Sequence, residues 1–539
     1  MAEFYRLRYQ VAKYLHNETR CKGVRTIMAD SFKQIVKIRP KGGIVTDITP
    51  GELDDNFYSR GQNVTFRSGS AQRCDGYAQV FDASPVEPWH ITFALVGNSF
   101  YWIVCGQSEV WVWDSVAWND ITPVGLSPAT VPNDWTSTTL NGIPCFNNGV
   151  SVPFYWGLNP GVVCEPLPGW SPTDRCKALR AFKYHLFALN MTRDGVEYPD
   201  LLLWSDAAEP GAVPGTWTPA ADNQAGDTIL AEAVGPIIDA APLRGQLAIY
   251  KANSTHLAQF IGGQFVFSFR KMFNVGVIAR DCIVPWRNQH LFITSGDVMI
   301  TDGTNINSCI DNRVRDFFFN TLNSDTYANT FAVHNPFHNE VLIVYPTQSG
   351  TANDNCLTFD YVENTWGIRS VPGVWAASEG FIPGSTDSWE SSAGSWNASN
   401  SAWEQAVFNP SKLQVVFGGE ESILYGLDTS GSAAQEPIEA YVIKDAMHFG
   451  EPDMRKLVKR VYPKFRGQAG GTVWVSMYGS DQPGQAPTWG PESEYDILSD
   501  SWITSFVSGK YISVRVRSTG TQVWRLDGFD LDVSAQGAF

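Results

Sequence analysis

The sequence has few charged side chains for its length, no long apolar run and no paired cysteine motif. Only 17% of its 539 residues are charged, and no apolar run approaches the roughly 18 residues that span a membrane as a helix. Its nine cysteines are an odd number without CxxC pairs or zinc-finger spacing. We therefore expect buried thiols in a reducing compartment. Export is not expected, because residues 1–27 lack the apolar core of a secretory signal.

Motifs of nucleotide, metal and nucleophilic chemistry are also absent from the sequence. It contains no phosphate-binding P-loop, no GxSxG elbow and no HExxH helix. His334 and His338 are four residues apart, but Pro336 between them breaks the helical face that two zinc ligands would share. We interpret them as polar side chains in a turn. We expect no enzymatic activity, no cofactor and no metal, and the sequence nominates no catalytic residue.

Negative charge exceeds positive charge along the chain. Lys and Arg number 39 against 55 Asp and Glu, a formal net charge of −16. Duplex DNA is a dense polyanion that proteins hold with basic side chains, so a sequence-reading DNA binder is not expected. The charge would suit the wall of a channel through which DNA slides. A neutral or acidic wall avoids the counterion release that makes DNA adhere.

Aromatic residues are abundant, with 20 Trp, 19 Tyr and 31 Phe. This composition favours many short β-strands whose aromatic side chains pack on pleated surfaces. The length allows roughly three to four domains of about 150 residues, or fewer if one is a large all-β unit.

A pair of strand types recurs between residues 85 and 430 with a period of roughly 40 to 60 residues. The first type is apolar, as in Ser99–Val104 and Glu340–Tyr345, and the second ends in aspartate, as in Val110–Asp114. Such pairs with scarcely any helical periodicity favour a β-propeller of six or seven blades, because radial repetition protects sheet edges. We interpret the closing aspartates as turn caps rather than metal ligands or acid–base groups. They are Asp114, Asp206, Asp302, Asp360 and Asp428.

The stretch Gly42–Tyr77 predicts a structural hairpin near the start of the chain. Asn63–Arg67 alternates polar and apolar residues, Ser68–Gly69 supplies a two-residue turn, and the return strand ends at Asp75–Gly76. Because type I′ and II′ turns need positive φ, Gly69 is expected to matter more than its neighbours. The residues assigned to this hairpin are Gly61, Asn63, Phe66, Gly69 and Gly76.

The region after Ser430 contains the most basic segment of the body, followed by short strands at Val473–Tyr478, Trp502–Val507 and Tyr511–Arg517. Such a run most often marks a solvated surface or a contact with an acidic neighbour, and contact with phosphates is the alternative. The candidate subunit or DNA contacts are Arg455, Lys456, Lys459 and Arg460.

Two segments stand apart from this pattern. Residues 1–27 form a basic arm with apolar residues at helical spacing, which indicates either a short amphipathic helix or an extension ahead of Met28. Residues 386–405 carry Trp389, Trp396 and Trp403 seven apart, but Ser, Gly and Asn dominate between them. We predict a long polar loop whose aromatic anchors bind a partner or a sugar.

Both ends of the chain resemble the tail nozzle proteins of short-tailed bacteriophages, also called tail tubular protein B or packaged-DNA stabilisation protein. Near the N-terminus, GIVTD, the NVTFRSG hairpin and the closing GY are similar to the family's signature. Near the C-terminus, GKYISVRV and WRLDGFD resemble its closing strands. The resemblance covers about a quarter of the chain. It implies an all-β fold in which residues 28–84 and 431–539 form one β-rich platform, with the propeller, residues 85–430, inserted between them.

The resemblance also implies a structural virion protein. Its copies, taken as six, would form a ring at the distal end of the tail and continue the DNA channel, after assembly in the host cytoplasm. The implied partners are a tail adaptor ring protein, a fibre, spike or plug protein, and double-stranded DNA in transit, with no membrane span. Two rivals remain: a glycan-cleaving propeller with paired carboxylates, for which no pair stands out, and a propeller that only binds carbohydrate or another tail protein.

Overall fold

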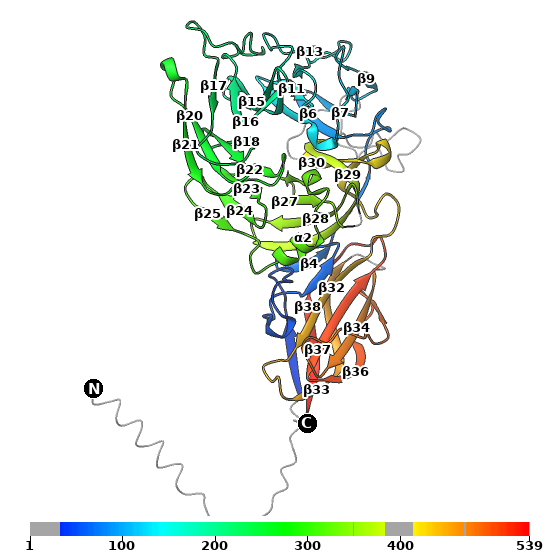
Figure 1. Ribbon diagram of the computed structural model, residues 1–539. Coiled ribbons are helices and arrows are strands. Elements are labelled where there is room, and N and C mark those ends of the chain that lie inside the picture. The colour runs from blue at the N-terminus through cyan, green and yellow to red at the C-terminus, as the bar shows by residue number, and fades with distance from the viewer. Residues whose placement is uncertain (1–32, 349, 383–412, 468–470, 538–539) are drawn as a thin grey trace, which may run out of the picture.

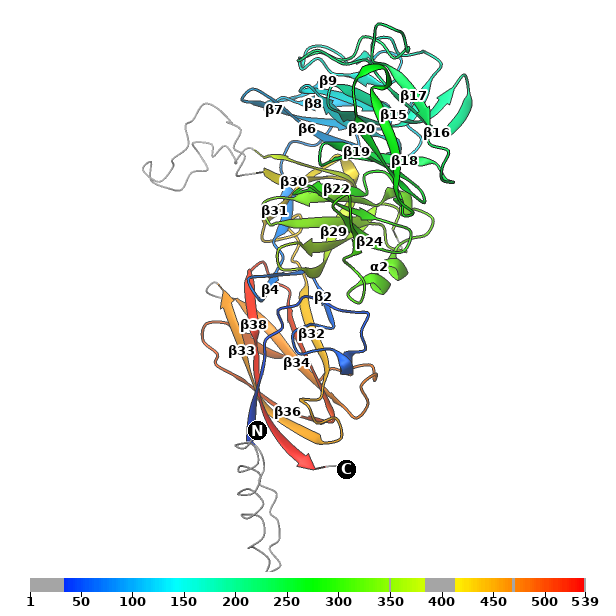
Figure 2. The same cartoon turned by 90° about the vertical axis from the view of Figure 1, so that its left-hand side faces the viewer.

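The computed structural model describes residues 33–348, 350–382, 413–467 and 471–537, which form a ring-shaped upper part and a narrower lower part (Figures 1 and 2). The upper part is the propeller, and the lower part contains both chain ends. The arm expected at residues 1–27 and the tryptophan-rich loop at 386–405 lie outside the described residues. Within the described ranges, no helix is both long enough and apolar enough to cross a lipid bilayer.

The first five blades of the propeller are separate four-stranded antiparallel sheets. Each blade uses consecutive strands, as expected when radial repetition builds the fold. In chain order their strands are β6 (His90–Val96), β7 (Ser99–Cys105), β8 (Val110–Trp113) and β9 (Trp118–Asp120); β10 (Thr136–Leu140), β11 (Ile143–Asn147), β12 (Phe154–Tyr155) and β13 (Glu165–Pro166); β14 (Arg175–Phe182), β15 (His185–Arg193), β16 (Val196–Trp204) and β17 (Gly226–Ile229); β18 (Ile237–Leu243), β19 (Gln246–Lys251), β20 (Thr255–Phe260) and β21 (Phe267–Phe273); β22 (Ile283–Trp286), β23 (Gln289–Ile293), β24 (Val298–Thr301) and β25 (Ile306–Ser308).

The sixth and seventh blades share one long strand, β29 (Thr365–Phe381). Its first part completes the sixth blade with β26 (Phe331–Asn335), β27 (Glu340–Tyr345) and β28 (Asn353–Asp360). Its second part starts the seventh blade, which continues through β30 (Leu413–Gly419), β31 (Leu424–Ser430) and β5 (Gly76–Gln79).

The pairing of β5 with β31 closes the ring, because β5 precedes the first blade in the sequence. The innermost strands of neighbouring blades contact one another around the whole circle, including β29 against β6. The expected all-β propeller is therefore confirmed, with seven blades. We expected residues 28–84 to belong to the platform alone, whereas β5 belongs to the propeller.

The platform is a sandwich of two antiparallel sheets. One sheet has the order β1 (Lys33–Ile38), β38 (Trp524–Gly537), β33 (Arg455–Gly467) and β36 (Ile503–Gly509). The other has the order β2 (Arg60–Gln62), β32 (Ala440–Met447), β37 (Tyr511–Ser518), β34 (Thr472–Ser480) and β35 (Ser493–Asp496). Buried Val461, Val514 and Leu531 belong to the core between them. The three strands predicted after Val473 therefore divide between two sheets, since β36 faces β34 and β37.

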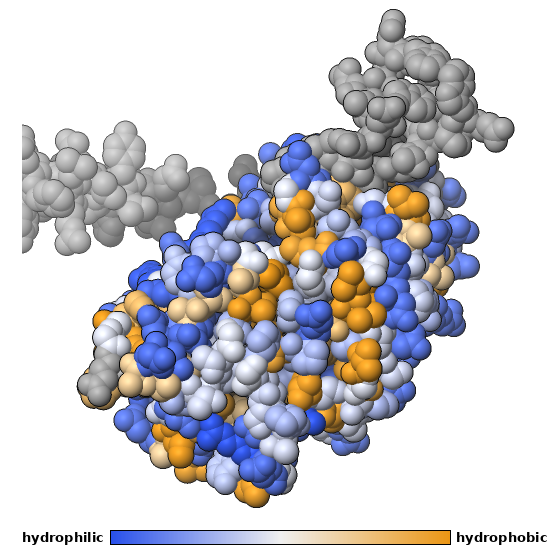
Figure 3. Space-filling model, turned by 90° about the horizontal axis from the view of Figure 1, so that it is seen from above, coloured by the Kyte–Doolittle hydropathy of each residue, from blue (hydrophilic) through white to orange (hydrophobic). Residues whose placement is uncertain are grey.

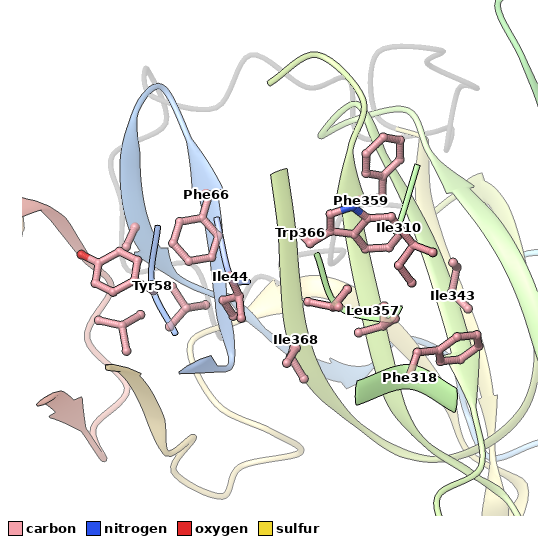
Figure 4. Close-up of a cluster of buried hydrophobic side chains, with 14 of the residues drawn as sticks. Ile44, Tyr58, Phe66, Ile310, Phe318, Ile343, Leu357, Phe359, Trp366 and Ile368 are labelled. Atoms are coloured by element: carbon pink, nitrogen blue, oxygen red, sulfur yellow. The ribbon is translucent and has the colours of Figure 1, made fainter. Parts of the chain in front are cut away.

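A hairpin of β3 (Val64–Arg67) and β4 (Ser70–Arg73) connects the two parts of the molecule. β3 pairs with β29 of the sixth blade, and β4 pairs with β38 of the platform. Figure 4 shows Ile44 between Phe66 and Ile368 of β29, with Trp366 of the same strand nearby and Tyr58 on the far side of Phe66; all five are buried in one core cluster. The propeller and the platform therefore share a continuous sheet and a continuous core.

On the face seen from above, apolar residues occur as small separate groups among polar ones, over the part of that face that is described (Figure 3). Scattered apolar side chains of this kind are normal on protein surfaces. The cysteines agree with the sequence-based expectation, because all eight in the described ranges are free thiols and seven of them are buried.

Candidate functional site

The hairpin that joins platform and propeller ends in a type I′ turn. Ser68 has φ 52° and Gly69 has φ 67°, the backbone that matches the twist of paired strands. The positive φ expected at Gly69 is thus confirmed. The N–H groups of Ser68 and Gly69 donate to the carboxylate of Glu363 at 2.5 and 3.2 Å. Because Glu363 lies between β28 and β29, a charge-assisted contact fixes the hairpin tip to the sixth blade.

Asn63 connects three segments at the base of the same hairpin. Its backbone is left-handed, with φ 56°, a conformation that asparagine tolerates better than most residues. Its Oδ1 accepts a hydrogen bond from the Ser370 N–H at 2.8 Å, and its Nδ2 donates to the Glu439 carbonyl at 2.8 Å. The side chain therefore ties β3 to a blade strand and to the segment that leads into the platform.

The other residues assigned to the hairpin lie where packing is close. Phe66 is 3% exposed, and its ring centroid lies 5.7 Å from that of Tyr58. A Cβ atom on Gly61 would lie 3.0 Å from an isoleucine side chain, and one on Gly76 would overlap the carbonyl oxygen of Ser432. Close approach of neighbouring chain segments, rather than turn formation, explains these two glycines.

Buried charges strengthen the joint on the hairpin side. Nη2 of Arg67 lies 2.6 Å from Oε1 of Glu340 on β27, and both side chains are largely buried. Burial raises the pKa of the Glu340 carboxyl, and Arg67 opposes that shift. Arg73, fully buried on β4, donates to the carbonyl oxygens of Gly431 and Gly520 at 2.6 and 2.9 Å. Removing a partner from such a buried charge is strongly destabilising.

A second buried ion pair lies between the sixth and seventh blades. Nη1 of Arg369 is 2.7 Å from Oδ1 of Asp428, and Nε2 of His338 is 3.3 Å from the other carboxylate oxygen. Burial alone would raise the pKa of Asp428, but Arg369 and His338 outweigh it and hold that pKa at about 2. Nη2 of Arg369 also donates to the Asp75 carbonyl at 2.5 Å. The pair thus reaches the end of the hairpin segment.

Most closing aspartates have the local role that the sequence predicts. Asp114, Asp302 and Asp360 each accept hydrogen bonds from the N–H groups two and three residues ahead, which confirms them as turn caps. Asp206 instead accepts from Ala207 and Gln224, and Asp428 forms the ion pair described above. The two histidines were expected in one turn, but His334 lies on β26 and only His338 lies in the turn that follows it. Nε2 of His334 lies 3.1 Å from the Tyr361 hydroxyl, so the two histidines have separate partners. Within the described ranges, no group of three or more His, Cys, Asp or Glu could hold a metal ion.

Lys456 does not occupy the surface position that its basic neighbourhood predicted. Its side chain is buried in the platform, and Nζ donates to the carbonyl oxygens of Glu451 and Lys510, the latter at 2.8 Å. Burial lowers the pKa of Lys456 to about 8. The interpretation of Lys456 as a subunit or DNA contact is therefore wrong, because strand alternation turns it toward the interior.

The other three basic candidates on β33 face different surroundings. Nη2 of Arg455 lies 3.3 Å from Asp481, and the Arg460 guanidinium lies over the Trp502 ring at 5.4 Å. Lys459 is exposed. The same strand also carries exposed Lys464 and Arg466, which lie 3.9 and 2.8 Å from Asp530 and Asp527. Because most of these basic groups already have partners, the strand presents a modest basic surface rather than a phosphate-binding groove.

A polar cluster in the central channel of the propeller was missed by the sequence analysis. Arg180 on β14 binds both carboxylate oxygens of Asp239 at 2.6 and 2.9 Å, and its Nη2 lies 2.7 Å from Asp281. Two cavities of about 210 and 350 Å³ lie along the inner strands beside it. Arg180 and Asp239 lie on the inner strands β14 and β18, and Asp281 lies just before β22. The three residues share no motif, so no local pattern could have identified them.

Comparisons with known proteins give no family. No protein-family model and no curated protein matches the chain. Solved structures show only a remote likeness. The WD40 beta propeller domain of Doa1 is 7% identical, with 65% of this chain and 96% of that chain covered at a TM-score of 0.38. A chain of the Mitotic Checkpoint Complex is 9% identical, with 66% and 93% covered at 0.36. An exo-beta-1,3-galactanase from Phanerochaete chrysosporium is 10% identical, with 85% and 100% covered at 0.25.

Proposed function

We propose that this chain is a structural subunit of the tail nozzle of a short-tailed bacteriophage. In this proposal six copies form a ring at the distal end of the tail, continue the channel for DNA ejection and anchor other tail proteins. The platform binds an adaptor ring above, and a fibre, spike or plug protein is held outside or below. The protein is assembled in the host cytoplasm and functions in the virion without catalysing a reaction.

The observation that carries the proposal is the position of the two stretches that resemble the nozzle family. Strand β4 of the first stretch pairs with β38 of the second, at Gln72 with Arg525 and at Ala71 with Leu526. Ser70 Oγ also donates to Asp527 Oδ1 at 2.7 Å, across 457 residues of sequence. The two stretches that resemble the nozzle family therefore lie together in the platform. This supports interpreting the resemblance as a signature of that one domain.

The joint between platform and propeller supports a mechanical role. A subunit of a channel wall has to keep its two parts in fixed relation while other proteins are attached to it. The shared sheet, the shared core and the buried Arg67–Glu340 pair resist relative movement of the two parts. The net charge of −16 favours passage of DNA over its retention.

Light scattering coupled to gel filtration tests the oligomer that the proposal requires. The purified full-length chain has a mass of 59.6 kDa, so a sixfold ring should elute with six times that mass. A protein that stays monomeric up to its solubility limit, alone and with its adaptor ring protein, would contradict the proposal. Release of reducing ends from a host-envelope polysaccharide would favour the glycan-cleaving alternative instead.

A further inference from the structure

The central channel contains a pocket where the inner strands begin. It has a volume of about 210 Å³ and lies among inner strands of the first, second, fifth, sixth and seventh blades. Trp89, just before β6, and Trp375, on β29, are half-buried and line it. The Trp375 indole is fixed in orientation, because its Nε1 donates to Glu87 Oε1 at 2.6 Å. These two rings give the pocket an apolar wall.

Uncharged polar groups line another part of the pocket. Nε2 of His90 lies 2.8 Å from Oγ of Ser137, which lies 3.0 Å from Oγ1 of Thr92. Burial lowers the pKa of His90 to about 4, so the imidazole is neutral at pH 7. Oδ1 of Asn133 accepts two hydrogen bonds from Arg280 at 3.1 and 2.9 Å. Its amide nitrogen has no acceptor within the described part of the chain and can donate to a ligand.

The carboxylate that lines the pocket already has a cation beside it, although that cation is shared with Asp239. Among the described lining residues, Asp281 supplies the carboxylate, and Nη2 of Arg180 lies 2.7 Å from it. No lysine or arginine is among the described residues that line the pocket, and the nearby Arg180 and Arg280 are already paired with aspartates, so an anion would find no unpaired cation there. A cation would compete with Arg180. A wholly apolar ligand would strip water from Ser137 and Asn133 without replacing its hydrogen bonds.

We propose that this pocket binds one ring of a neutral sugar. A pyranose presents an apolar C–H face that packs on tryptophan, and hydroxyls that bond to serine, asparagine and neutral histidine side chains. The volume is below the roughly 300–1,000 Å³ of pockets for drug-sized ligands, so a single ring fits better than an extended chain. The inference does not depend on the nozzle proposal, because the pocket lies in the propeller channel and the platform contributes nothing to it.

Saturation-transfer NMR on the full-length protein tests this assignment with methyl glycosides of glucose, galactose, mannose and N-acetylglucosamine. At least one should bind with a dissociation constant on the order of 1 mM, as expected for so small a ligand. Trp375→Ala should weaken that binding about tenfold or more through lost stacking. Ser137→Ala should weaken it by a similar factor, because a sugar hydroxyl loses its partner.

Matched variants separate loss of the pocket from loss of folding. Trp502→Ala removes a tryptophan of the platform that is 51% exposed and should leave sugar binding unchanged. Trp375→Phe keeps an aromatic ring and should retain most of the affinity, and thermal unfolding of each variant reports its folding. The proposal is overturned if no glycoside receives saturation from the wild-type protein. It is equally overturned if binding survives both Trp375→Ala and Ser137→Ala.

Discussion

The backbone conformation at Gly69 limits which residues can replace it in the hairpin of β3 and β4. Its φ of 67° is left-handed, and a Cβ atom there would lie 3.2 Å from the Lys41 side chain. We expect Gly69→Val to lower the free energy of unfolding by about 1–2 kcal/mol, because β-branched residues are strained at this φ. Urea unfolding followed by tryptophan fluorescence measures the change.

Gly69→Asn is the matched control for that strain. Both substitutions remove the glycine, but asparagine adopts the left-handed region more readily than valine. Gly69→Asn should therefore recover most of the free energy of unfolding that Gly69→Val loses. Equal unfolding midpoints for Gly69→Val and the wild type would show that the turn does not need positive φ.

Asp428 makes stability depend on pH at the acid end. Its pKa is about 2 in the folded chain against 3.8 as the reference. Because folding lowers this pKa, the ionised carboxylate stabilises the fold at pH values above about 4. That contribution to the free energy of unfolding, about 2 kcal/mol, is lost as the pH falls through about 2. Asp428→Asn keeps the shape and tolerates the local φ of 58°. It should cost about 3 kcal/mol at pH 7, because Arg369 is left buried without its anion.

The comparison between wild type and Asp428→Asn isolates this carboxylate from the others. The difference in their free energies of unfolding should be constant from pH 7 to about pH 5 and should shrink between about pH 4 and pH 2. A difference that stays the same down to pH 2 would mean that Asp428 is not held ionised by Arg369.

Among the elements, β5 is the strand on which closure of the propeller depends. The N–H of Val80, at its end, donates to the Leu424 carbonyl at 3.0 Å. Val80→Pro removes that donor and should destabilise the closure by about 3 kcal/mol. Amide exchange in β31 should then accelerate by up to about 100-fold, while β33 and β38 of the platform keep their protection.

Val80→Thr is the control for that substitution, because it keeps the N–H and the branched shape. It should leave the exchange rates of β31 near those of the wild type. Unchanged exchange of β31 in Val80→Pro would show that another contact closes the ring.

At the scale of the elements, the strands whose own residues show a clear pattern could be predicted from the sequence. The apolar type at Ser99–Val104 is the second strand of its blade, and the type that ends at Asp114 is the third. The second blade gave no such signal, because Thr136–Leu140 is polar and β12 and β13 have two residues each. The joining hairpin was predictable from its turn residues. The channel pocket was not, since it forms only where inner strands of distant segments converge.

For the whole molecule, charge predicts how the assembled ring handles DNA. With a net charge of −16 and only a modest basic surface on β33, duplex DNA should bind weakly at about 150 mM salt and more tightly as salt is lowered. Fluorescence anisotropy of labelled duplex across a salt series measures this. Tight binding that persists well above that salt, or ATP hydrolysis stimulated by DNA, would show an active DNA-handling protein.

Electron microscopy of the purified full-length protein tests the central claim most directly. The nozzle proposal predicts closed rings of six subunits with an open central channel, the platforms joined around it and one seven-bladed propeller projecting from each. Images that show only separate subunits, or a closed assembly whose centre is filled by protein with no passage for duplex DNA, would contradict it.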